Sequence, residues 1–269
     1  TISHLDLRNG PRYNRCGYIR VDTVHQPERD GEKSVYHINA VDEVTQWEVL
    51  GCLPKISEHY LIPVLGVMIA QFPFCLLGFH SDNGSEYIND PVASLLEKLR
   101  AEFTQSRPRH SNDNALVETK NGAVVRKNMG YHWLPPSHAD QIDAFYQEWF
   151  NPHLNYHRPC AFATVRTDAK GKTRKVYEFY ATPYERLKSL PNTERFLRPG
   201  VSFAALDRIA RADSDTQFAR QMQQARHELL RRCAQAGAAA PVPLCPRTGN
   251  QAASGEPSPT TRPVGGQRS

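Results

Sequence analysis

The chain has 269 residues, of which 39% are hydrophobic, so it can bury a sizeable core as one large domain or one domain with appendages. Lys and Arg outnumber Asp and Glu by 33 to 28, and the formal charge of +5 suits a polyanionic partner but also occurs in many soluble proteins. No apolar run approaches the roughly 20 residues that span a bilayer, so we expect no membrane segment.

The six cysteines form no C-x-x-C pair. This spacing argues against a structural zinc site and against a secreted disulfide framework, and it favours the reducing cytosol. The sequence starts at Thr1 rather than at Met, which indicates a fragment. We therefore expect a cytoplasmic protein whose upstream part is not included.

Strand-forming residues dominate the start of the chain after a polar linker, residues 1–16. Residues 17–25, 34–44 and 45–53 are each rich in β-branched and aromatic side chains and are separated by turn residues, which predicts a three-stranded antiparallel meander. Ser57 is expected to cap a helix over residues 58–70, where apolar residues recur at three- and four-residue steps, and Pro73 is expected to stop it.

The middle of the chain alternates between the two patterns. Residues 75–82 are typical of a strand buried on both faces, residues 91–102 of an amphipathic helix, and residues 103–108 of a short parallel strand. A further helix is expected around Glu118, with Asn112 to Asn114 as its cap. This order predicts an α/β fold with a mixed sheet.

The C-terminal half differs in composition. We expect a helix at residues 139–150, a basic hairpin at 160–180, an Arg-rich helix at 203–233, and disorder in the proline-rich tail. The predicted organisation is therefore a linker (1–16), a core (17–135), a helical and basic extension (136–233) and a disordered tail (234–269).

Three carboxylates are candidates for a functional site because of their positions in the predicted strands and helix. Asp22 interrupts a predicted strand, Asp82 follows a buried strand, and Glu118 borders the apolar stripe of its helix. The members of that stripe are Leu116, Val117, Ala123 and Val124. Each carboxylate alone has an ordinary explanation: a structural or solvated aspartate, an Asp-Asn-Gly turn, and a solvated helix residue.

As a set the three carboxylates are more specific, because thirty-five residues separate Asp82 from Glu118. This spacing, with the segments VDTVH, NAVDEVTQW, HSDNGSEY, NDNALVETKNG and NYHRP, resembles the DDE transposase and retroviral integrase superfamily, specifically the integrase-type core of bacterial insertion-sequence transposases. The resemblance covers about residues 15 to 160. The chain differs at Gln46, where Arg is common, at Cys160, where His often follows Arg-Pro, and at residues 161–180, which look inserted.

The resemblance implies an RNase H-like fold, with a five-stranded mixed sheet flanked by helices. The strands bearing Asp22 and Asp82 would be neighbours, and the helix bearing Glu118 would pack across them. It also implies a metal-dependent enzyme that nicks DNA at a transposon end and joins the new 3′-hydroxyl to target DNA.

The implied cofactor is Mg²⁺, with Mn²⁺ as a substitute, and two ions are expected. Asp22 would bridge them, while Asp82 and Glu118 would each hold one. Oxygen ligands suit this cation, and two ions stabilise charge on both the attacking and the leaving oxygen of a phosphodiester. The implied partners are transposon ends and target DNA, bound by a homo-oligomer at the bacterial nucleoid.

Basic residues around Glu118 are the candidates for phosphate contacts, with an ordinary solvated basic face as the alternative. They are Arg107, Arg109, Lys120, Arg126 and Lys127. The Arg-rich segment 203–233 is left open between DNA binding, subunit contact and plain solubility.

Several histidines have ordinary explanations beside functional ones. His80 and Asn83 flank Asp82 and would orient substrate or satisfy local hydrogen bonds, of which we favour the second for His80. His153 and His157 have the four-residue step of a zinc half-site but lack a cysteine pair, so we expect no zinc there.

Two other functions remain open at this point. One is a catalytically silent DNA-binding or assembly relative of a transposase, and the other is a nuclease that cuts DNA but never joins it.

Overall fold

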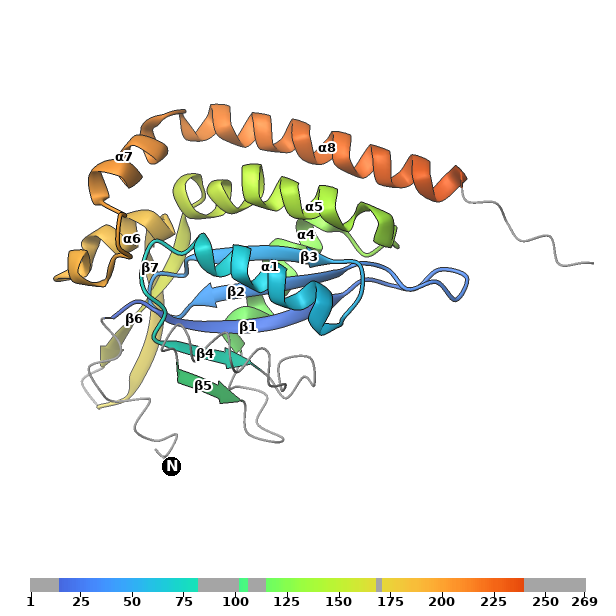
Figure 1. Ribbon diagram of the computed structural model, residues 1–269. Coiled ribbons are helices and arrows are strands. Elements are labelled where there is room, and N and C mark those ends of the chain that lie inside the picture. The colour runs from blue at the N-terminus through green and yellow to red at the C-terminus, as the bar shows by residue number, and fades with distance from the viewer. Residues whose placement is uncertain (1–14, 82–101, 106–114, 168–170, 240–269) are drawn as a thin grey trace, which may run out of the picture. The chain divides into compact units, whose positions relative to one another are not determined.

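The computed structural model describes residues 15–81, 102–105, 115–167 and 171–239 (Figure 1). The strands are β1 (Tyr18–His25), β2 (Tyr36–Asp42), β3 (Glu48–Leu53), β4 (Gly78–Ser81), β5 (Glu102–Gln105), β6 (Cys160–Thr167) and β7 (Thr173–Ala181). The α-helices are α1 (Glu58–Ala70), α3 (Ala115–Lys120), α4 (Lys127–Met129), α5 (Ala139–Phe145), α6 (Pro183–Ser189), α7 (Phe203–Arg211) and α8 (Asp215–Ala239). The π-helical segments are η4 (Asn121–Arg126), η6 (Tyr146–Phe150) and η7 (His153–His157), and the 3₁₀ segments are η5 (Pro136–His138) and η8 (Thr193–Phe196).

The main sheet has five strands in the order β3-β2-β1-β4-β5. The first three strands pair antiparallel, as the predicted meander required, whereas β4 is parallel to both β1 and β5. The predicted mixed α/β architecture is therefore confirmed. Glu102 begins β5 and does not end a helix as predicted, and the rest of the predicted helix at 91–102 lies outside the described residues. Strands β6 and β7 form a second sheet of their own.

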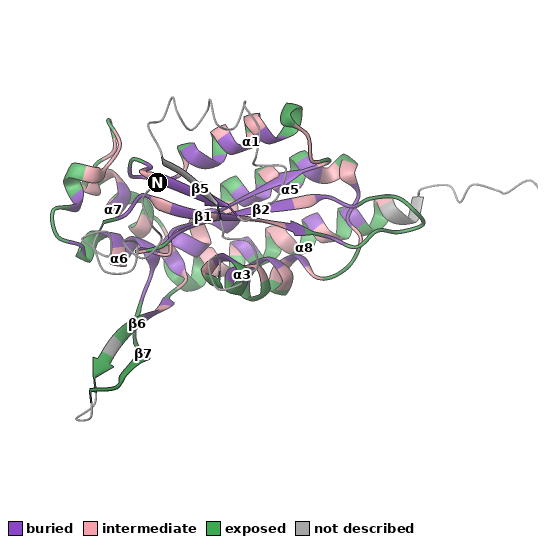
Figure 2. Cartoon of the chain, turned by 90° about the horizontal axis from the view of Figure 1, so that it is seen from below, coloured by how far each residue is buried: buried purple, intermediate pink, exposed green. Residues whose placement is uncertain are grey.

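The two faces of the main sheet differ in chemistry. Because side chains alternate along a strand, one face carries mainly apolar core residues, which pack on α1, α6 and α7, together with Thr23 and the buried Asp42. The other face packs on η4, α5 and α8, and its apolar side chains are joined by the polar residues Asp22, His37, Asn39 and Glu48. Figure 2 shows α1 and α3 on opposite sides of the sheet. The face under α3 is thus the polar one.

Helix α1 has the bounds that its apolar periodicity predicted. Ser57 occupies the N-cap position, but its side chain accepts no hydrogen bond from the first turn, so the predicted capping interaction is wrong. The helix ends at Ala70, before Pro73, and it also tolerates Pro63 in its interior.

A π-helical segment interrupts the helix that carries Glu118. The chain is helical from Ala115 to Met129, with the wider η4 turns in the middle. A π turn rotates less per residue than an α turn, so the buried stripe shifts along the sequence. Val124 and Val125 are both fully buried, whereas Ala123, predicted in the stripe, is exposed.

Asparagine side chains cover the exposed edge of the sheet at β3. The Leu50 N–H donates to Asn151 Oδ1 (2.9 Å), and the Glu48 N–H donates to Asn155 Oδ1 (2.8 Å). Each asparagine amide also donates back to the carbonyl of the same residue, over 3.1 and 2.7 Å. Asn151 and Asn155 are four residues apart on a helix, which is a distance of about 6 Å along its axis. Their partners Leu50 and Glu48 are two residues apart on the strand, about 6.6 Å, so the two spacings match. These bonds satisfy the edge that would otherwise be free to pair with another chain.

The C-terminal segment forms two helices, not the single helix predicted for residues 203–233. Ser214 interrupts the helical run, because its side chain accepts a hydrogen bond from the Gln217 N–H at the start of α8 (3.3 Å). Helix α8 then continues to Ala239, beyond the predicted end at residue 233. Its residues Met222 and Leu229 are buried against α5 and the sheet, which explains why the helix persists. The rest of the tail predicted to be disordered, residues 240–269, lies outside the described residues.

Two negative findings concern the described residues only. None of the helices there is both long enough and apolar enough to cross a membrane. The cysteines Cys16, Cys52, Cys75, Cys160 and Cys233 are free thiols.

Candidate functional site

The sheet register brings the two strands that precede the candidate aspartates together. Val21 of β1 is paired with Ser81, the last residue of β4, in a parallel ladder. Asp22 follows Val21 in β1, and Asp82 follows Ser81 in the sequence but lies outside the described residues. Ser81 is fully buried. The adjacency of these two strands is the one that the family resemblance implied.

Asn121 connects the half-buried Asp22 carboxylate to the helix that carries Glu118. The Asn121 Nδ2 donates to Asp22 Oδ2 over 2.6 Å, and its Oδ1 accepts a hydrogen bond of 3.0 Å from Asn39 Nδ2. The other Asp22 oxygen accepts from the Thr23 N–H (2.8 Å). Asn121 lies three residues after Glu118, so both residues share one side of the helix. The sequence reasoning missed Asn121, although this spacing was a signal that could have identified it.

The donors at this position fit a hard divalent cation. Asp22 offers carboxylate oxygens at the surface of the sheet, and Glu118 is exposed on the helix that crosses it. Asn121 already uses both of its polar atoms, so it orients Asp22 and is not itself a free ligand. Carboxylate oxygens are the ligands that Mg²⁺ prefers. Within the described ranges no three His, Cys, Asp or Glu side chains are grouped for a metal, and Asp82 is not among those ranges.

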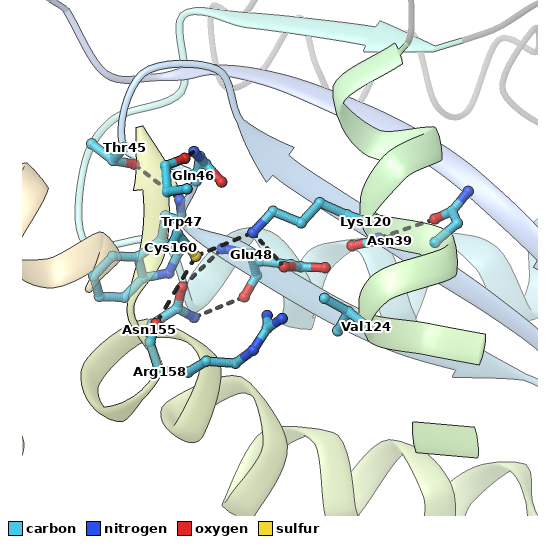
Figure 3. Close-up of polar contacts among 12 residues, drawn as sticks. Asn39, Thr45, Gln46, Trp47, Glu48, Lys120, Val124, Asn155, Arg158 and Cys160 are labelled. Atoms are coloured by element: carbon cyan, nitrogen blue, oxygen red, sulfur yellow. Dashed lines mark hydrogen bonds and ion pairs between the residues drawn. The ribbon is translucent and has the colours of Figure 1, made fainter. Parts of the chain in front are cut away.

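A buried ion pair lies next to this site and involves Lys120, which lies between Glu118 and Asn121 on the same helix (Figure 3). Lys120 Nζ is 3.3 Å from Glu48 Oε2, and it also donates to Cys160 Sγ over 3.3 Å. The side chains of Lys120 and Glu48 are only 9% and 1% exposed. Burial raises the pKa of Glu48, and the positive charges of Lys120 and Arg158 oppose that rise. The pair fastens the Glu118 helix to β3 and to the start of β6.

The predicted phosphate contacts lie in different environments. The ammonium of Lys120 is buried and ion-paired, a position that does not favour contact with DNA. Arg126 donates to Gln26 Oε1 (2.8 Å) and to the His25 carbonyl (2.6 Å), and Lys127 is exposed. Arg107 and Arg109 lie outside the described residues.

Arg126 also fixes a buried hydrogen-bond chain. Since Gln26 Oε1 accepts from Arg126, its Nε2 faces His37 Nε2 at 3.1 Å, which must then be the acceptor. The neutral His37 ring therefore carries its proton on Nδ1, 2.9 Å from the Tyr146 hydroxyl. Burial lowers the pKa of His37 to about 3, which keeps the ring neutral at physiological pH.

The other candidate histidines lie in different surroundings. His80 is buried in β4, and Asn83 lies outside the described residues. His157 Nδ1 is 2.9 Å from Asp215 Oδ1, and its ring stacks on Phe218, so it holds the start of α8. Burial lowers the pKa of His153 to about 4.

Gln46 and Cys160, the two positions that differ from the family's pattern, both contact the β6–β7 sheet. Gln46 has a positive φ of 56° and donates from Nε2 to the Ala161 carbonyl over 2.9 Å. Cys160 begins β6 and accepts the hydrogen bond from Lys120. The two departures therefore accompany the segment that looked inserted.

Sequence comparison finds a relative that matches part of the chain. No protein-family model matches the sequence. "Uncharacterized protein y4rM" of Sinorhizobium fredii is 35% identical over 126 residues, which cover 46% of this chain and 35% of that protein. The chain therefore matches about a third of the length of this relative.

Among solved structures, retroviral integrases are similar at low scores. The catalytic core domain of BIV integrase has a TM-score of 0.42 at 16% identity, covering 64% of this chain and 95% of that one. A simian T-cell lymphotropic virus intasome in complex with PP2A regulatory subunit B56 gamma has a TM-score of 0.39 at 17% identity. The match covers 48% of this chain and 49% of that one. The HTLV-2 integrase catalytic core domain in complex with magnesium has a TM-score of 0.36 at 15% identity. The match covers 44% of this chain and 73% of that one. With TM-scores below 0.5, these similarities do not identify the function of the chain.

Proposed function

We propose that the chain is the catalytic core of a DNA transposase of the DDE and integrase superfamily, with an RNase H-like fold. It would cleave DNA strands and transfer them, using Asp22, Asp82 and Glu118 as metal ligands. The order and spacing of the motifs around these residues support the proposal.

The observation that carries the proposal is the convergence of three segments that are distant in sequence. Asp22 lies on β1, beside the end of β4, and Asn121 binds the Asp22 carboxylate from the helix that bears Glu118. A merely solvated aspartate would not require a hydrogen bond from the helix that bears Glu118. The mixed sheet and the pairing of β1 with β4 are also consistent with the resemblance.

The proposed chemistry divides between metal and protein. Two divalent cations held by these carboxylates would stabilise charge on the attacking and leaving oxygens of the phosphodiester. Asn121 would hold Asp22 in one orientation, and the Glu48–Lys120 pair would hold the helix in register with the sheet. Preorganisation of this kind matters, because displacement at phosphorus depends on positioning and electrostatics.

The proposed partners follow from the same assignment. DNA is the substrate, as transposon end and as target, and a homo-oligomer would bring two ends to one target. The net charge of +5 is compatible with a polyanion.

A plasmid-nicking assay tests the proposal without knowledge of the DNA ends. Supercoiled plasmid is incubated with Mn²⁺ and the wild-type chain, Glu118→Gln, or the matched control Glu58→Gln, which changes an exposed glutamate on α1. We expect nicking by the wild type and the control, and a loss of at least 100-fold in Glu118→Gln, equivalent to about 2.7 kcal/mol of barrier.

The outcomes separate the candidate functions. Nicking that persists in Glu118→Gln would contradict the proposed site. DNA binding without nicking in the wild type would favour the catalytically silent relative. Nicking without any joining of 3′-hydroxyl ends to plasmid would favour the nuclease.

A further inference from the structure

The β6–β7 sheet is a two-stranded ribbon that projects from the main sheet, as Figure 2 shows. All of β7 except its last residue is exposed or half-buried. Two aromatic side chains of β7 are accessible despite their size: Tyr177 is 55% and Tyr180 65% exposed. Exposed aromatic groups gathered on one element usually mark a binding surface.

The ribbon is also basic. In its described part, Arg166, Lys172, Arg174 and Lys175 face a single acidic residue, Glu178. The register places Arg166 directly opposite Arg174, and like charges at opposed positions destabilise a strand pair. Glu178 forms an ion pair with Arg166 and offsets part of this repulsion. The described part of the ribbon therefore keeps an excess of positive charge, which suits a polyanionic partner.

A β-bulge brings Lys175 and the exposed Tyr177 and Tyr180 onto one face of the ribbon, opposite to the face of Arg166 and Arg174. Thr173 is opposite Thr167, and Tyr180 is opposite Ala161. Thr167 and Ala161 are separated by an even number of positions in β6, so they and their β7 partners lie on the same face of the ribbon. The register shift near Phe162 is what allows odd- and even-numbered β7 residues to share that face. Lys175 and Tyr177 alternate with Thr173 and lie on that face too, and both are exposed.

The base of the ribbon is fixed, whereas its outer part has no core. Phe162 and Ala181 form a small buried cluster at the base, and Gln46 and Lys120 bond to the first residues of β6. Beyond this base the residues of β7 that the structure describes are exposed or half-buried, and a two-stranded ribbon without a core is marginally stable in water. Since Lys120 lies two residues after Glu118, the ribbon starts beside the candidate site.

We propose that the β6–β7 ribbon is a DNA-binding arm, whose Lys175, Tyr177 and Tyr180 face contacts the backbone of duplex DNA that enters the site. The inference rests on the proposed function, because it assigns a holding surface to the same substrate. A two-stranded ribbon fits the major groove of B-DNA, which is about 12 Å wide. Lysine binds phosphate as a point charge, and exposed tyrosines supply hydroxyl donors and ring contacts.

Fluorescence anisotropy with a labelled duplex tests the arm separately from catalysis. The variant Lys175→Ala with Tyr177→Ala is compared with the matched control Lys55→Ala with Tyr60→Ala, which removes an exposed lysine and an exposed tyrosine near the start of α1. Thermal unfolding verifies that both remain folded. We expect about tenfold weaker binding in the ribbon variant only, with a salt slope smaller by about 0.9 for the lost phosphate contact.

Binding and salt slope equal to those of the control would overturn the proposal. So would a change in oligomeric state by sedimentation with unchanged DNA affinity, since the ribbon would then be a contact between copies of the chain. Either result leaves the nicking test of Glu118 unaffected, because that test does not depend on the ribbon. Conversely, nicking that survives Glu118→Gln would reject the catalytic assignment while the ribbon still bound DNA.

Discussion

Substitution of Lys120 by methionine should be one of the most destabilising single changes in the core. It removes the ammonium 3.3 Å from Glu48 Oε2 and leaves a carboxylate that is 1% exposed. Two unit charges at this separation attract by about 5 kcal/mol at an effective dielectric constant of about 20. Loss of one partner from a buried pair costs about 3–5 kcal/mol. We therefore expect Lys120→Met to lower the free energy of unfolding by about that amount.

A double-mutant cycle measured by urea unfolding isolates the pair. Glu48→Gln alone should also be destabilising, because it leaves the buried ammonium of Lys120 uncompensated. The double variant should lie within about 1 kcal/mol of the wild type, since it buries no isolated charge. Near-wild-type DNA affinity in the double variant would show that Lys120 serves the fold and not the phosphate backbone.

The pH dependence gives a second test. Burial already raises the pKa of Glu48, and without Lys120 the protonated carboxyl is favoured further in the folded state. A raised folded-state pKa gives stability that is present below the unfolded value, about 4.5, and lost as the pH rises through the folded value. Lys120→Met should therefore lose stability relative to wild type as the pH rises above about 4.5. Additive losses in the double variant, or a cost below about 1 kcal/mol, would refute this reasoning.

Three further predictions follow from the polar face of the sheet. Asn121→Ala should weaken Mn²⁺ binding about 10-fold or more, because an outer partner orients Asp22; unchanged affinity in calorimetry would remove Asn121 from the site. His37 is neutral when folded, with a pKa near 3, so its contribution is complete above the unfolded value of 6.5 and is lost as the pH falls. Urea unfolding should show about 2 kcal/mol of this loss between pH 6.5 and 5, and His37→Gln should not show it. Asn155→Ala should cost about 2–3 kcal/mol and speed hydrogen exchange at the Glu48 amide, and a cost near zero would mean that water replaces the side chain.

The secondary structure was predictable wherever a single periodicity dominates. The bounds of α1 and the positions of β1 to β4 follow from apolar spacing, because these segments bury one or both faces in the core. The π turns of η4 have no sequence signal, so the exposure of Ala123 and the burial of Val125 were missed. The continuation of α8 to Ala239 was also missed, since local composition does not reveal that Met222 and Leu229 anchor the helix.

Some features of the candidate site were predictable from the sequence and others were not. Strand adjacency and the crossing helix were implied by the motif resemblance, and the β1–β4 pairing and the Asn121–Asp22 bond agree with it. The burial of Lys120 was not predictable, because its partner Glu48 comes from a distant strand and the local pattern shows only a basic residue beside Glu118. The roles of Asp82, Arg107 and Arg109 stay predictions, since these residues lie outside the described ranges.

Calorimetric titration of Mn²⁺ tests the central claim most directly, because it requires no knowledge of the DNA ends. The wild-type chain is compared with Asp22→Asn, Asp82→Asn and the control Glu58→Gln in the presence of generic duplex. The account predicts metal binding by the wild type and the control, and its loss in both aspartate variants. Equal binding by all four proteins, or by none, would contradict a metal site built from Asp22, Asp82 and Glu118.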